Sequence, residues 1–251
     1  ALNLEENQKQ GSTGGLFDES IAVIPSKVGI YKDYFELLQI LKLAFIKAKT
    51  LGSLIQIDNQ HLQNLVALKE LLQAKEKGTD PSAKQAAINI SPIINQAITL
   101  AQKYDAVVAN PPYMGSKWMG NELKSFAIKK FPNSKSDLFS IFMERSFSLL
   151  TESGYNAQVN MQSWMFLSSY EKLREWLLKS KNIMCLMQIG YNSFPELNSK
   201  IVQCSAFCVQ NTPINGYKGV YTNLNKAPQS ANKNNVFLIR DPLLDFHLSS
   251  G

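Results

Sequence analysis

Apolar residues recur every three or four positions through much of the first hundred residues of this chain. This spacing predicts amphipathic helices over residues 31–49, 58–72 and 81–102. Gly52 is expected to end the first of these helices, and Pro92 is expected to interrupt the third. Between the first two helices, the short apolar run 53–57 predicts a strand.

From residue 104 onward the pattern changes to short apolar runs that alternate with helical segments. Strands are predicted over 104–110, 155–161, 183–189, 201–210 and 217–223. Helices are predicted over 121–131, from Asp137 to a stop at Gly154, and over 169–180. The alternation predicts an α/β fold with a doubly wound, mostly parallel sheet and helices on both faces. The short turn 211–216 predicts that the last two strands form an antiparallel hairpin at the sheet edge.

The distribution of polar and glycine residues predicts three regions. Residues 1–29 are polar and glycine-punctuated and are expected to form a flexible arm, and residues 30–223 are expected to form one domain. Residues 224–251 begin as a polar linker and continue into the start of a following region that is expected to be truncated. The glycines of the arm do not follow a strand, so they are interpreted as loop residues and not as a nucleotide-binding turn.

The predicted strand 104–110 runs directly into Asn110-Pro111-Pro112-Tyr113. Two prolines cannot donate ladder hydrogen bonds, so the strand must stop and present an amide and a phenol at its carboxyl end, where ligands bind in open α/β sheets. The Asn110 side-chain oxygen and a proline carbonyl can each accept an N–H of a planar amine, and Tyr113 can stack on an aromatic base. These four residues are the catalytic candidates. The alternative is that they only terminate the strand.

Composition narrows the class of protein. The chain has 251 residues, is 45% hydrophobic and carries a net charge of +6 with a pI near 9.1, a basic excess compatible with a polyanionic partner. The three cysteines lack metal-ligand spacing and only two histidines are present, so we expect reduced core cysteines, a cytoplasmic protein and no metal site. No apolar run reaches the length of about 18 residues that a membrane span needs, and no export signal is expected.

The stretch 103–119, KYDAVVANPPYMGSKWM, resembles motif IV of adenine-specific DNA methyltransferases. The segments 51–57, 134–178 and 194–210 are also similar to the BREX-type phage-defence methyltransferases of the PglX group and to type IIG-like enzymes. The likeness extends over about residues 31–222. The resemblance implies a Rossmann-like methyltransferase fold that transfers a methyl group from S-adenosyl-L-methionine to the N6 amine of an adenine flipped out of double-stranded DNA. It also implies a restriction-modification or phage-defence system, whose other proteins are candidate partners.

The resemblance further implies roles for individual residues. Asn110 and Pro111 would hold the adenine amine and Tyr113 would stack on the base, while Phe194 would contact the base from the other side and Trp118 would line the same pocket. For Phe194, a hydrophobic plug beneath its loop is an equal alternative. Trp164 and Trp176 are expected in the core.

Gly52, Ser53 and Leu54 would contact the adenosine part of the cofactor, with an ordinary strand start as the alternative. Lysines that cluster after the corner could meet DNA phosphates or could simply form a solvated helix face; they are Lys117, Lys124, Lys129, Lys130 and Lys135.

The sequence departs from the family pattern before the Asn-Pro-Pro-Tyr strand. Such enzymes bind S-adenosylmethionine through a glycine-containing strand-to-helix turn and an acidic residue that ends the next strand, and neither is found here. We therefore expect a fragment of a larger methyltransferase that lacks the N-terminal part of its sheet and binds the cofactor weakly or not at all. Two other functions stay open: a protein-glutamine or RNA guanine-amine methyltransferase, and a non-catalytic DNA-binding or assembly subunit.

Overall fold

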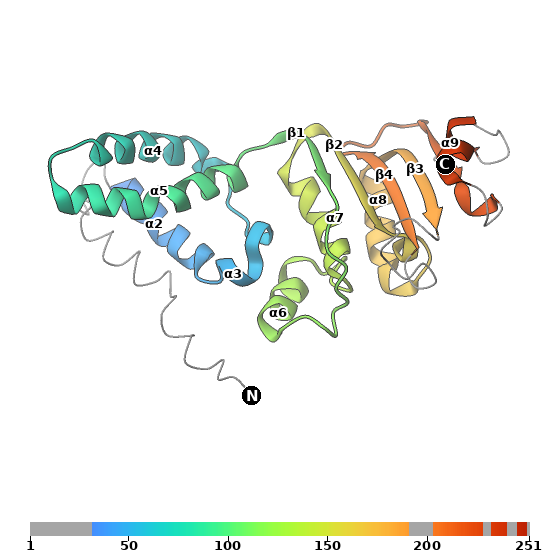
Figure 1. The fold of residues 1–251 in the computed structure, drawn as a ribbon, viewed down its shortest axis with the longest axis horizontal. Coiled ribbons are helices and arrows are strands. Elements are labelled where there is room, and N and C mark those ends of the chain that lie inside the picture. Colours follow the sequence, from blue (N-terminus) through green and yellow to red (C-terminus); the bar gives the residue numbers. More distant parts are fainter. Residues whose placement is uncertain (1–31, 191–202, 228–231, 240–244, 250–251) are drawn as a thin grey trace. The chain divides into compact units, whose positions relative to one another are not determined.

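The computed structural model describes residues 32–190, 203–227, 232–239 and 245–249 (Figure 1). The chain divides into two compact units, Ala1–Gln102 and Lys103–Gly251, so the boundary falls inside the range expected to form one domain. The expected flexible arm, residues 1–29, lies outside the described residues. No helix among the described residues is long and apolar enough to cross a membrane.

The described part of the first unit is helical, as its apolar spacing predicts. Its α-helices are α2 (Lys32–Phe45), α3 (Ala48–Leu51), α4 (Leu62–Glu76) and α5 (Pro81–Ala101). The start of α5 is well defined, because the Asp80 side chain accepts hydrogen bonds from Ser82 N at 2.9 Å and Ala83 N at 3.3 Å. Buried residues on α4 and α5 line the contact between these two helices; they are Leu65, Leu68, Leu72, Ala87, Ile90, Ile94 and Ala97.

Two expectations for the first unit are wrong. Residues 53–57 do not form a strand: Gly52–Leu54 is a turn of 3₁₀ helix, and the segment after it is extended but has no partner strand in the described, helical part of this unit. Pro92 does not interrupt α5, which is continuous from Pro81 to Ala101. Proline removes one backbone hydrogen bond, but Ile90 and Ile94 are fully buried on either side of it and keep the helix packed.

A six-stranded mixed sheet forms the centre of the second unit (Figure 1). Its strands are β1 (Tyr104–Ala109), β2 (Leu150–Met161), β3 (Asn182–Gly190), β4 (Cys204–Gln210), β5 (Lys218–Asn223) and β6 (Asp245–Ser249). They lie in the order β1-β2-β4-β3-β5-β6. Only β1 with β2 and β3 with β5 are parallel; the other neighbours are antiparallel.

The predicted edge hairpin and the mostly parallel sheet are therefore wrong. Strand β4 does not pair with β5 but lies between β2 and β3, antiparallel to both. Strand β5 lies on the far side of β3 and runs parallel to it. The reason is packing: Phe207 and Val209 of β4 are buried in the hydrophobic core cluster of this unit, between the strands on either side.

The helices of the second unit are α6 (Asn121–Lys130), α7 (Leu138–Leu149), α8 (Glu171–Ser180) and α9 (Lys233–Ile239). Helices α7 and α8 contribute to one hydrophobic cluster with β3 and β4. The cluster includes Phe139, Met143, Phe147, Trp164, Tyr170, Leu173, Leu177, Leu186, Phe207 and Val209. The expected core positions of Trp164 and Trp176 are confirmed, the latter as a partly buried side chain packed on the cluster.

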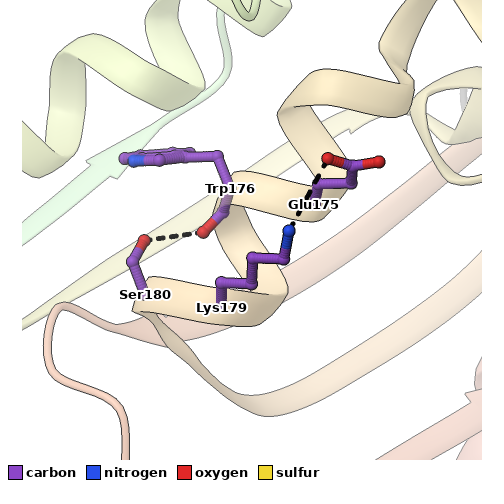
Figure 2. A network of polar contacts seen from close by, with 4 residues as sticks. All are labelled: Glu175, Trp176, Lys179 and Ser180. Atoms are coloured by element: carbon purple, nitrogen blue, oxygen red, sulfur yellow. Dashed lines mark hydrogen bonds and ion pairs between the residues drawn. The ribbon is translucent and has the colours of Figure 1, made fainter.

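Helix α8 makes polar contacts between its own residues and packs on α7 through an aromatic ring. Lys179 Nζ lies 3.8 Å from Glu175 Oε2, and Ser180 Oγ donates to the carbonyl oxygen of Trp176 at 2.6 Å. Both contacts are drawn as dashed lines in Figure 2. The Trp176 ring lies 5.4 Å from the Phe147 ring of α7 in an edge-on arrangement. The exposed ion pair contributes at most about 1 kcal/mol to stability, so the ring packing holds α8 in place.

The opposite face of the sheet carries small and apolar residues. One row crosses five strands in register, through Val108, Ala157, Cys208, Cys185 and Val220. Val108, Cys185 and Val220 are exposed, so the expected helices on both faces are not found in the described part of this unit. The core position expected for all three cysteines is confirmed only for Cys204.

Gly154 does not end the helix that precedes it. Helix α7 ends at Leu149, and Gly154 lies within β2. A Cβ at Gly154 would stand 3.0 Å from the carbonyl oxygen of Tyr104 and 3.1 Å from that of Asp105. Glycine is needed here because the backbone of β1 approaches closely at an irregularity in the β1–β2 register.

Candidate active site

The Asn-Pro-Pro-Tyr corner lies at the carboxyl end of β1, as the sequence predicts. Strand β1 ends at Ala109, which pairs with Gln158 of β2. Asn110 is exposed, Pro111 is buried, Pro112 is exposed and Tyr113 is half-buried. Among the described residues no hydrogen bond is made by the Asn110 side chain, which is exposed at the end of β1.

The corner is also held at its far end. Met114 N donates to Asp137 Oδ1 at 2.9 Å, and Leu138 N donates to the carbonyl oxygen of Met114 at 2.9 Å. Gly115 and Asp137 form an isolated antiparallel bridge. The four corner residues therefore lie between two fixed points, the β1–β2 pairing and this bridge. We refer to the contacts between residues 114–115 and 137–138 as the clip.

Asp137 serves the clip and the start of α7 together. Its side chain is 8% exposed and accepts from Phe139 N at 3.2 Å, which caps the helix, while Ser140 Oγ completes the capping box. Burial raises the pKa of Asp137 above its ordinary value, against the lowering effect of the backbone N–H groups that it accepts. Burial and the nearby Asp137 charge raise the pKa of Tyr170 to about 12.

Tyr113 is fixed by contacts on two sides. Its ring centroid lies 5.9 Å from that of Phe139 with the planes nearly perpendicular, and its hydroxyl lies 3.7 Å from Cys204 Sγ. Burial, followed by the Cys204 contact, raises the pKa of the phenol above its ordinary value. Tyr113 therefore stays protonated at neutral pH, and its ring is the part available for chemistry on a ligand.

Replacing Tyr113 by phenylalanine is expected to change activity by less than about threefold, because only a weak sulfur contact is lost. Tyr113→Ala, in contrast, is expected to weaken base binding by about 10–100-fold, since stacking contributes about 1–3 kcal/mol per base. Steady-state kinetics of the methyl transfer that the resemblance implies, measured for both variants of the natural full-length protein, would check this. A phenylalanine variant as impaired as the alanine variant would show that the hydroxyl acts.

A buried ladder of amides lies beside the corner and is absent from the sequence-based expectations. Asn156, Gln158 and Asn160 of β2 are buried on the α7 side of the sheet. Asn160 Nδ2 donates to Gln158 Oε1 at 3.0 Å, Gln158 Nε2 to Asn156 Oδ1 at 2.9 Å, and Asn156 Nδ2 to the carbonyl oxygen of Met143 at 3.2 Å. The alternation of amides at 156, 158 and 160 was a visible signal, but alternating polar residues normally indicate the solvent face of a strand.

All amides of the ladder donate in one direction, toward α7. The acceptor at the other end, Asn160 Oδ1, is the buried side-chain atom without a partner in the described part of the chain. Asn160 stands two residues beyond Gln158, the partner of Ala109, so the open end of the ladder points toward the corner end of the sheet. A connected network of this kind favours one arrangement of β2 on α7, because each buried amide depends on the next.

The remaining candidate residues occupy different parts of the chain. Trp118 follows the corner in the same unit, is 73% exposed and has Lys117 Nζ 5.5 Å from its ring centroid. Phe194 lies outside the described residues. Gly52, Ser53 and Leu54 belong to the first unit, where Gly52 has a φ of +50° and Leu54 is buried. Their proposed cofactor contacts stay a prediction.

The five candidate lysines are all exposed. They lie on the loop after the corner, on α6 and just before α7; they are Lys117, Lys124, Lys129, Lys130 and Lys135. Their exposure is compatible with a phosphate backbone as partner and equally with a solvated surface.

Among the described residues, the donor groups do not form a recognisable cofactor or metal site. The described residues before β1 form helices, so this part of the chain contains no strand-to-helix turn of the kind that the resemblance implies for binding S-adenosylmethionine. No group of three or more metal-ligating side chains occurs among the described residues. The chemistry that can be derived from these residues therefore concerns the planar amine that the corner can hold.

Proteins similar in sequence to this chain are adenine-specific methyltransferases, as the resemblance of its Asn-Pro-Pro-Tyr motif predicts. The family model of the Eco57I restriction-modification methylase matches residues 31–194, more than half of the chain. The adenine-specific methyltransferase BrxX of Escherichia coli O9:H4 (strain HS) is 45% identical over 235 residues, 94% of this chain and 19% of that protein. The adenine-specific methyltransferase PglX of Lacticaseibacillus casei (strain Zhang) is 33% identical over 208 residues, 80% of this chain and 17% of that protein.

Among solved structures, the Type IIL restriction-modification enzyme MmeI in complex with DNA is similar, with a TM-score of 0.43 and 13% identity over 62% of this chain and 19% of that chain. The chain spans about a fifth of the length of the relatives BrxX and PglX. Because the family model matches more than half of its residues, the chain belongs to the Eco57I restriction-modification methylase family.

Proposed function

We propose that this chain is the acceptor-binding part of a DNA methyltransferase that acts on the N6 amine of adenine, in a restriction-modification or phage-defence system. The observation that carries the proposal is the Asn110-Pro-Pro-Tyr113 corner at the carboxyl end of β1, held at both ends in a member of this family. S-adenosyl-L-methionine is the methyl donor in this proposal. Assembly with other proteins of the same defence system belongs to the proposal as well.

The corner acts on the adenine amine in a specific way. Asn110 Oδ1 accepts one N–H of the amine and the carbonyl of Pro111 accepts the other, which draws the nitrogen lone pair out of conjugation with the ring. Tyr113 stacks on the base and keeps it in line for transfer. No general base is required, because the proton leaves after the new C–N bond forms. This agrees with a corner that contains no titrating acid or base at neutral pH.

Double-stranded DNA is the partner in this proposal. The exposed lysines after the corner provide positive charge on the same unit, and the net charge of +6 is of the right sign. A flipped adenine reaches the corner only if the DNA phosphate backbone lies close to it. The positive charge of these lysines therefore supports docking of DNA on the side of the unit that carries the corner.

The test uses the natural full-length protein, S-adenosylmethionine with an isotopically labelled methyl group, and DNA, RNA and protein substrates in separate reactions. We expect label in N6-methyladenine of DNA, identified by mass spectrometry of the nucleosides. Label in guanine of RNA or in glutamine would replace this function with one of the two enzyme alternatives. DNA binding without label in any substrate would identify a non-catalytic subunit.

A further inference from the structure

Four large apolar side chains are exposed on the loops that follow β1 and β2. Met114 and Trp118 follow β1, and Phe166 and Leu167 follow β2. Phe166 is 60% exposed and Leu167 is 54% exposed. Because β1 and β2 are parallel, both loops emerge at the carboxyl end of these strands, where the corner also lies. We call these four residues the apolar rim.

The loop that carries Phe166 and Leu167 is rigidly held. Arg174 Nη1 donates to the carbonyl oxygen of Trp164 at 2.8 Å and to that of Leu167 at 2.7 Å. Leu167 N donates to the carbonyl oxygen of Ser163 at 3.0 Å. An arginine on α8 thus fixes the backbone on both sides of Phe166, while the two apolar side chains remain outside.

Hydrogen bonds also join this loop to the corner. Ser136 Oγ donates to the carbonyl oxygen of Ser169 at 3.0 Å, and Ser116 N donates to the carbonyl oxygen of Ser136 at 3.0 Å. Residues 134–138 therefore form a bridge between the loop after β1 and the loop after β2. The apolar rim and the corner are parts of one bonded surface, and the rim is not a separate tip that moves independently.

Two adjacent large apolar side chains on a rigid exposed backbone are costly to leave in water. A flat aromatic and a branched aliphatic side chain fit between base pairs, where a protein that opens the DNA stack inserts an apolar wedge. When a base leaves the duplex its former neighbours lose a stacking partner, and the flipped state is stabilised if an apolar group replaces it.

From this arrangement we propose that Phe166 and Leu167 form a wedge that enters the DNA stack beside the flipped adenine and stabilises the extruded state. The proposal rests on the proposed function. The corner holds the base once it is out of the helix, whereas the wedge lowers the free energy needed to bring it out. Phe166 and Leu167 are thus positioning residues and do not touch the reacting atoms.

The test compares Phe166→Ser and Leu167→Ser in the natural full-length protein with Leu178→Ser, a matched control on α8 whose side chain is 67% exposed. On fully paired DNA, kcat/KM of both wedge variants is expected to fall by about 10–100-fold, and the control is expected to be unchanged. On DNA with the target adenine opposite an abasic site, where flipping is easier, the loss is expected to be less than about threefold. Phe166→Leu is expected to retain most activity on both substrates.

A second measurement reports flipping directly. With 2-aminopurine at the target position, the unmethylated complex is expected to be several times less fluorescent for the wedge variants than for the parent. Equal losses on paired and abasic DNA, or full activity of both serine variants, would refute the wedge while leaving the proposed function in place. If the parent protein methylates no DNA, both proposals fail.

Discussion

Replacing Asn110 by alanine is expected to lower the rate of methyl transfer to DNA by about 10²–10³-fold, the usual effect of removing one preorganised polar group from a reacting centre. The side chain is exposed at the carboxyl end of β1, so its removal leaves no cavity and no buried group without a partner. We therefore expect an unchanged melting temperature and nearly unchanged DNA affinity. The measurement is single-turnover methylation with saturating cofactor, alongside a DNA-binding titration.

Asn215→Ala is the matched control for this prediction. Asn215 is an exposed asparagine in the turn between β4 and β5. Because β4 runs antiparallel to β2, this turn lies at the end of the strands opposite to the corner. Its replacement is expected to leave methylation unchanged. Full activity of the Asn110→Ala protein would show that the corner does not hold the amine.

Removal of the Asp137 side chain is expected to have the second largest effect. Asp137→Ala leaves the partly buried N–H of Met114 and the buried N–H of Phe139 without their acceptor and removes the cap of α7. The free energy of unfolding is expected to fall by about 2–4 kcal/mol, from the lost cap and the unpaired donors. Activity measured well below the melting temperature is expected to fall by about 10–100-fold, since the corner loses one of its two fixed ends.

Asp137→Asn separates these effects, because its amide oxygen can still accept both bonds. We expect most of the activity to return. The raised pKa of Asp137 means that the fold favours the protonated carboxyl. The stability of the parent relative to the asparagine variant is therefore greatest below the ordinary pKa and decreases as pH rises through the raised value. Thermal unfolding of both proteins between pH 4 and 7 tests the sign; a difference that grows with pH in favour of the parent would contradict it.

Local sequence determined most of the helices and the position of the corner. Helical spacing located α2, α4, α5, α6 and α8 to within a few residues, and Asp80 and Asp137 cap their helices as predicted. These features depend on interactions between residues at most four positions apart, so a linear pattern contains them. The end of β1 was equally predictable, because consecutive prolines stop a strand wherever it lies.

Only the tertiary structure decided how distant segments meet. The central place of β4, the exposure of Val108, Cys185 and Val220 on one face and the inward orientation of the amides at 156, 158 and 160 depend on which strands lie side by side. A strand pattern alone is compatible with several strand orders. The same holds for the corner. Asn110-Pro111-Pro112-Tyr113 could be recognised in the sequence, but the clip to Asp137 joins residues 23 positions apart and appears only once the chain has folded. The sequence by itself determined which residue types occupy the corner. Long-range hydrogen bonds and packing determine the geometry in which the corner residues are held.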